Sequence, residues 1–233
     1  MGLVCWKKGK KDQKRKGNWD CSRRYHWIDD NEKCANNWKP DHTIRWLIIA
    51  ESPPCPTFHD EPPYIYRITK QDEERPILDS IVSAFMKASG ETKVLASKED
   101  KLDYMKNEEG AFLMDLCCYP LNKMKPTIRR DLREDSEYEF YLRLLGLIEE
   151  YHRRIENIVI VGVGWHENAL QAIEIAHLND LLRNRETEIP FPSHWRNNHE
   201  RCVGLLSKIF VNPKWEKTFL TTTSSRDGSI RTD

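Results

Sequence analysis

Three short apolar runs, separated by segments with helical periodicity, constrain the fold of this chain more than any other feature. They have the length of buried strands and span residues 44–50 (IRWLIIA), 111–116 (AFLMDL) and 158–163 (IVIVGV). Apolar residues recur at helical spacing over 75–88, 138–154, 167–182 and 198–210, and a weaker fourth apolar run covers 188–191. Strands that alternate with helices predict a three-layer α/β/α domain around a central, mostly parallel four-stranded sheet.

The length of 233 residues suits one such domain with an extension at each end. We expect a basic, aromatic N-terminal arm over 1–40, the α/β domain over 41–215 and a flexible C-terminal tail over 216–233. No run of 18 apolar residues and no apolar leader is found, which argues against a membrane span and a secretion signal. Seven scattered cysteines indicate reduced thiols and a cytoplasmic protein, with a monomer as the default state.

The net charge of zero hides an asymmetry along the chain. Residues 1–24 carry nine Lys or Arg and two Asp, so a segment of net charge +7 precedes a remainder of −7. Such an arm, which also contains Trp, suits nucleic-acid phosphates and bases, although a solvated tail has the same composition. Zinc is the other alternative, but no Cys-x-x-Cys pair is present, so we expect no metal. The potential zinc ligands are Cys5, Cys21, His26 and Cys34.

Residues that can carry chemistry follow each apolar run. Glu51 and Ser52 follow the first run, Asp115 lies near the end of the second, and 164–168 (GWHEN) and 192–198 (PSHWRNN) follow the third and fourth. The carboxyl ends of parallel strands meet at one edge of a sheet, and ligands of such sheets bind there. We therefore expect these residues to surround one cleft.

Four motifs in this order resemble those of the uracil-DNA glycosylase superfamily. They are LIIAESPP, FLMDLCCYPLNK, IVIVGVGWHENAL and IPFPSHWRNNHERCVGLL, within residues 44–211. The resemblance implies an enzyme that flips a base out of duplex or single-stranded DNA and hydrolyses its bond to deoxyribose. It implies no metal or redox cofactor.

The first motif departs from the family at the catalytic position. Ser52 stands where relatives have a water-activating Asp, or Asn or Ala, and a Ser hydroxyl is a poor base at neutral pH. The carboxylate function then falls to Glu51 or to Asp60, and Ser52 can orient the water. Alternatively, Glu51 only bonds amides of its own loop.

The last motif departs as well, since Phe191 replaces the His that stabilises the departing base in relatives. His194, three residues later, could take over that role, or it could be an exposed His beside a phosphate. The resemblance assigns DNA contacts to this loop and to the first motif, with two residues wedged into the duplex and a phosphate held at the helix N-terminus. The wedge residues are Trp195 and Arg196, and the other contacts are Pro53, Ser193 and Asn197.

Base choice is expected to depend on Asp115, because relatives carry Asn at this position. An ionised carboxylate only accepts hydrogen bonds, so it matches the N4 amino group of cytosine and repels the O4 of uracil. If burial keeps Asp115 protonated, it can also donate to N3. A register slip by one residue would instead make Asp115 a turn cap. Tyr64 or Tyr66, together with Phe191, is expected to contact the flipped base, with core packing as the alternative for the tyrosines.

The resulting prediction is a monofunctional DNA glycosylase for a modified cytosine-type pyrimidine, in repair or in defence against modified foreign DNA. A uracil or hypoxanthine glycosylase that uses protonated Asp115 is one alternative. A non-catalytic nucleic-acid-binding module is another, favoured by Ser52 and Phe191.

Overall fold

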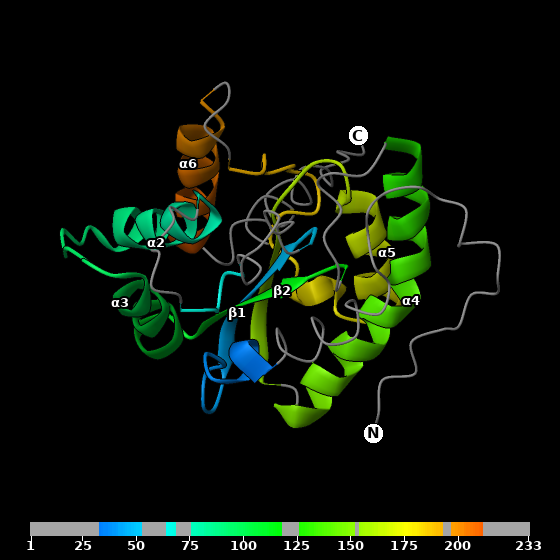
Figure 1. The fold of residues 1–233 in the computed structure, drawn as a ribbon, viewed down its shortest axis with the longest axis horizontal. Helices are drawn as coiled ribbons and strands as arrows, with labels where there is room; N and C mark the ends of the chain where they lie inside the picture. Colours follow the sequence, from blue (N-terminus) through cyan, green and yellow to red (C-terminus); the bar gives the residue numbers. More distant parts are fainter. Residues whose placement is uncertain are drawn as a thin grey trace, which may run out of the picture.

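The computed structural model describes residues 33–52, 64–68, 76–117, 126–151, 154–192 and 197–211. Its centre is a parallel sheet with strand order β2-β1-β3, formed by β1 (Ile44–Ala50), β2 (Ala111–Asp115) and β3 (Ile155–Ile160). Helices lie on both sides of this sheet (Figure 1). The predicted α/β fold with parallel strands is therefore confirmed.

Strand β1 is central because it pairs with β2 along one edge and with β3 along the other. All of its residues except Arg45 are buried, as expected for an apolar run that pairs with a neighbour on each side. On one face, the Trp46 ring packs edge-on against Phe210 at a centroid distance of 4.7 Å. Phe210 stacks in turn on Phe85 at 3.9 Å.

These aromatic contacts join one helical layer to the sheet. Phe85 belongs to α2 (Pro76–Ser89) and Phe210 to α6 (Asn198–Val211), both at the positions where helical spacing predicts them. The opposite layer contains α4 (Pro126–Glu150) and α5 (His166–Ile175) (Figure 1). Helix α4 begins twelve residues before the predicted start, at a proline, which suits the first turn of a helix.

The fourth strand differs from the prediction. In the described part of the chain the sheet has three strands, and residues 188–191 contribute one bridge, between Ile189 and Val161. Leu182 forms a second bridge, with Ile158. Between them the Asn184 side chain accepts from the Ile160 N–H at 2.9 Å and donates to its carbonyl at 2.8 Å. A side-chain amide thus replaces strand pairing along the outer side of β3.

A helical segment before β2 is absent from the predicted elements. Helix α3 (Lys98–Asp103) continues into a π-helix, η2 (Tyr104–Glu108). Helix α3 begins with a capping box, in which the Ser97 hydroxyl accepts from the Asp100 N–H and the Asp100 carboxylate accepts from the Ser97 N–H. A short 3-10 helix, η3 (Asn179–Leu181), follows α5.

Part of the expected N-terminal arm packs on the domain. Residues 33–36 are helical, and Ala35 is buried in the core. The Trp38 indole donates to the Tyr66 carbonyl at 3.0 Å. The described end of the predicted arm, residues 33–38, therefore packs against the α/β domain. The rest of the arm, which includes the potential zinc ligands Cys5, Cys21 and His26, and the C-terminal tail lie outside the described residues.

Candidate functional site

The strand order determines where a ligand site is expected. From β1 the chain crosses to β2 on one side and later to β3 on the other, so the order reverses at β1. Open α/β sheets bind ligands at such a reversal, outside the carboxyl ends of the strands. We refer to this end of the sheet as the carboxyl edge. Glu51 follows β1 there, Asp115 ends β2, and the turn of residues 161–165 follows β3.

Hydrogen bonds hold the chains after β1 and β2 together beyond the strands. Asp115 is in register with Ala50, and the Leu116 N–H donates to the Ala50 carbonyl at 2.8 Å. One residue further, the Cys117 N–H donates to the Glu51 carbonyl, also at 2.8 Å. Glu51 and Asp115 therefore lie on neighbouring segments at the same edge of the sheet.

Arg143 of α4 fixes the end of β2 from the side of the helical layer. Its guanidinium donates to the carbonyls of Asp115 at 2.8 Å and Leu116 at 2.7 Å. Arg143 was not among the site residues predicted from the sequence. The sequence feature that could have pointed to Arg143 is its place as a basic residue beside the apolar stripe of α4, which contains Phe140, Leu144 and Leu147.

The Asp115 carboxylate is the most unusual group of the site. The residue is 9% exposed, and within the described structure its carboxylate has no hydrogen-bond or ion-pair partner. Burial raises the pKa of Asp115 to about 7, the positive charge of Arg143 lowers it, and the negative charge of Glu51 raises it further. Near neutral pH this carboxyl group therefore exists in both its acidic and its basic form.

Three further residues lie beside Asp115 at the carboxyl edge. Glu51 is 5% exposed, and Ser52 is half-buried. The Cys117 thiol is buried, and burial raises its pKa to about 12 in spite of a hydrogen bond with Ser136. Since the thiolate is the nucleophilic form, Cys117 is a packing residue at neutral pH.

An aromatic pair borders the site after β3. Gly162 has a φ of +120°, and a Cβ there would lie 1.7 Å from the Trp165 ring, so only glycine allows this turn. Trp165 is buried and meets Phe191 edge-on at a centroid distance of 6.0 Å. Phe191 is 40% exposed, which leaves an aromatic surface free at the carboxyl edge.

The two tyrosines expected to contact a base are both buried. Tyr66 stacks on Phe112 at 5.4 Å, and its hydroxyl donates to the Leu113 carbonyl and accepts from the Leu113 N–H. The Tyr66 hydroxyl thereby pairs with backbone groups on the outer edge of β2. Burial raises the pKa of Tyr66, and the negative charge of Asp115 raises it further. Tyr64 packs edge-on against Tyr66 at 5.6 Å. These contacts favour core packing for Tyr66.

Several expected site residues lie outside the described residues: Pro53, Asp60, Ser193, His194, Trp195 and Arg196. Asn197 is described. It is exposed, has a φ of 56° and precedes α6, where its carbonyl accepts from the Arg201 N–H at 3.1 Å. The structure thus brings Glu51, Ser52 and Asp115 together at the carboxyl edge, with Phe191 bordering it after β3.

No known family model, curated protein or solved structure matches this chain. Among the described residues, no helix is long and apolar enough to cross a membrane. The same residues contain no group of three or more His, Cys, Asp or Glu side chains arranged to hold a metal ion, and Cys34 has a free thiol.

Proposed function

We propose that the protein is a monofunctional DNA glycosylase that removes a modified cytosine-type base from DNA. One observation carries the proposal beyond the resemblance of its motifs. Asp115 is a nearly buried acceptor without a donor, at the position where the resemblance expects the base to be read. A buried polar group left without a partner costs about 1–3 kcal/mol, and an amino group of a bound base would supply the missing donor.

The reaction assigns a separate role to each side chain. A water molecule adds its oxygen to C1′ of the deoxyribose and loses a proton to the Glu51 carboxylate. The bond between C1′ and the base nitrogen breaks, and its electron pair leaves with the base, which then takes up a proton. Asp115 binds the amino group of the base, and the exposed face of Phe191 packs against its ring. Ser52 orients the water.

The pKa of Asp115 favours uracil or hypoxanthine as a second candidate substrate at lower pH. Below about pH 7 the group is protonated and can donate a hydrogen bond, as a carbonyl of uracil or hypoxanthine requires. Above it, the group only accepts. The proposed enzyme therefore prefers cytosine-type bases increasingly as the pH rises through 7.

The test uses duplexes and single strands that each carry one base: cytosine, 5-methylcytosine, 5-hydroxymethylcytosine, uracil or hypoxanthine. After incubation with the full chain, alkali cleaves the DNA wherever a base has been removed. We expect cleavage on a modified cytosine and little on plain cytosine, with the ratio to uracil rising between about pH 6 and pH 8. Binding without any cleavage would replace the proposed enzyme with a DNA-binding module.

A further inference from the structure

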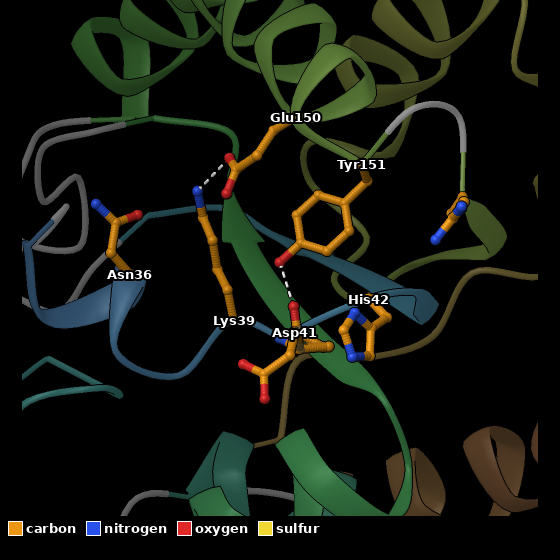
Figure 2. A pocket seen from close by; sticks show the side chains of 8 residues that line it. Asn36, Lys39, Asp41, His42, Glu150 and Tyr151 are labelled. Carbon is orange, nitrogen blue, oxygen red and sulfur yellow. Dashed lines mark hydrogen bonds and ion pairs between the residues drawn. The ribbon is translucent and has the colours of Figure 1, made fainter.

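A pocket of about 660 Å³ lies at the other end of the sheet, which we call the amino edge. It is formed where the chain enters β1, where α4 ends and where β3 is about to begin (Figure 2). Its lining residues are Asn36, Lys39, Pro40, Asp41, His42, Glu150, Tyr151 and Arg154. The volume falls within the range of small-molecule sites, about 300–1,000 Å³, and exceeds what a single small ion needs.

The wall of this pocket is fixed by hydrogen bonds. The Tyr151 hydroxyl donates to the Pro40 carbonyl at 2.6 Å, and the Tyr151 residue is 6% exposed (Figure 2). The Arg154 N–H donates to the Tyr151 carbonyl at 2.8 Å, and the Arg154 carbonyl accepts from the Ile44 N–H at 2.9 Å. The backbone that carries Arg154 is thus tied to both the helix end and β1.

Both acids of the pocket are already neutralised by lysines. The Lys39 ammonium lies 2.7 Å from the Glu150 carboxylate, and Figure 2 marks this ion pair by a dashed line. The Lys106 ammonium lies 3.3 Å from the Asp41 carboxylate. In contrast, the side chains of His42 and Arg154 have no hydrogen-bond or ion-pair partner within the described structure. The groups left uncommitted are therefore hydrogen-bond donors, one of them a permanent cation.

We propose that the amino-edge pocket binds the phosphate group of a nucleotide, with Arg154 as the principal contact and His42 as the second. A guanidinium presents paired N–H donors that match two phosphate oxygens. The remaining volume beside Tyr151 accommodates the organic part of the ligand. The phosphate could belong to a free mononucleotide or to the end of a DNA strand. Because the pocket lies at the opposite edge from Glu51 and Asp115, this inference is independent of the proposed glycosylase activity.

The experiment measures binding by calorimetry and by amide chemical shifts, with the full chain. The probes are inorganic phosphate, a deoxynucleoside 5′-monophosphate, its nucleoside, and a short oligonucleotide with or without a 5′-phosphate. Arg154→Gln should weaken binding of the monophosphate at least about tenfold and His42→Gln less, in line with the larger contribution of a charged bidentate donor. Arg130→Gln is the matched control, because this exposed arginine is at the distant start of α4 and faces Glu134 at 3.9 Å.

A third variant tests the role of charge within the pocket. Glu150→Gln removes the partner of Lys39 and leaves the ammonium free, so it should tighten phosphate binding severalfold. If the pocket had no role in phosphate binding, Glu150→Gln would not increase the affinity for phosphate. Binding of only the mononucleotide, or of only the 5′-phosphorylated strand, identifies the source of the phosphate and supports the proposal. Equal affinity in the Arg130 and Arg154 variants, an adventitious ion only, or no binding of any probe would overturn it.

Discussion

The acidic side chains at the two ends of the sheet lie in opposite environments. At the amino edge, Asp41 and Glu150 are exposed, and each has a lysine beside it. At the carboxyl edge, Glu51 and Asp115 are buried, and Asp115 has no partner in the described structure. An exposed ion pair contributes little to stability, whereas an unpaired buried carboxylate costs a large amount.

This difference favours the carboxyl edge as the place of the proposed chemistry. A carboxylate that is costly to keep and that stabilises nothing in the free protein needs another reason for its position. Binding a donor from a substrate is such a reason, and catalytic groups commonly have pKa values shifted in this way. At the amino edge lysines already neutralise both acids and the Arg154 side chain has no partner in the described structure, which suits the phosphate binding proposed for that edge.

Loss of the Glu51 carboxylate should have the largest effect. Glu51→Gln keeps the size of the side chain but removes the proton acceptor, so base excision should fall about 10²- to 10⁴-fold. DNA binding should change much less. Glu149→Gln, an exposed glutamate on α4, is the control for the removal of a negative charge. Unchanged excision by the Glu51 variant would remove Glu51 from the mechanism and leave Asp60 as the carboxylate to test.

The second effect concerns stability and follows from the pKa of Asp115. In the unfolded chain Asp115 loses its proton near its ordinary value of 3.8, but in the folded chain it does so near 7. Between these values the folded state holds one proton more, so its stability falls as the pH rises. Asp115→Asn removes this penalty.

Urea unfolding of both proteins measures the difference. Relative to wild type, the Asp115→Asn variant should gain on the order of 2–4 kcal/mol between about pH 4 and pH 8. Comparing two pH values cancels the constant effect of the new amide on packing. A difference that is independent of pH would mean that the carboxylate is not held in its neutral form by burial.

The third effect concerns base choice by the same residue. Asn donates and accepts, so Asp115→Asn should shift preference from the modified cytosine toward uracil by about 5- to 150-fold, which corresponds to a polar mismatch of roughly 1–3 kcal/mol. Excision rates on matched duplexes give the ratio for variant and wild type. If wild type already favours uracil and the variant keeps the same ratio, Asp115 does not read the base.

The fold was accessible from the sequence where periodicity determines structure. The runs 44–50 and 111–116 became β1 and β2, and the spacing over 75–88 and 198–210 became α2 and α6. Strand β3 starts three residues before its predicted start because Ile155 and Asn157 already pair with Ile44 and Trp46 of β1. The predicted fourth strand over 188–191 is reduced to a single bridge. Beside β3 the Asn184 side chain supplies the hydrogen bonds instead, and the periodicity of apolar residues does not show such a contact.

The candidate site was predictable only in part for a similar reason. The strand ends locate Glu51 and Asp115, since the carboxyl ends of parallel strands share one edge. Arg143 lies 28 residues from Asp115 in sequence and contacts its main chain, which only the packing of α4 reveals. Conversely, Tyr66 has the residue type of a base-stacking group, but its hydroxyl satisfies the outer side of β2.

The smallest expected effect concerns the basic arm, which joins the domain next to the amino edge. Deleting residues 1–24 removes nine Lys or Arg and two Asp. If the arm binds DNA, the slope of log affinity against log salt should become shallower by about 0.9 for each phosphate that the arm neutralises in the full chain.

The same deletion also distinguishes DNA binding at the carboxyl edge from mononucleotide binding at the amino edge. An arm that follows DNA toward the carboxyl edge contributes nothing to the amino-edge pocket, so the truncated chain should bind the mononucleotide as the full chain does while its DNA affinity falls. Measuring both affinities over a salt series on one preparation makes the comparison direct. An unchanged salt slope for DNA would show that the arm does not bind phosphates. A parallel decrease in mononucleotide binding would instead place the arm at the amino edge, with its positive charge acting on the phosphate beside Arg154.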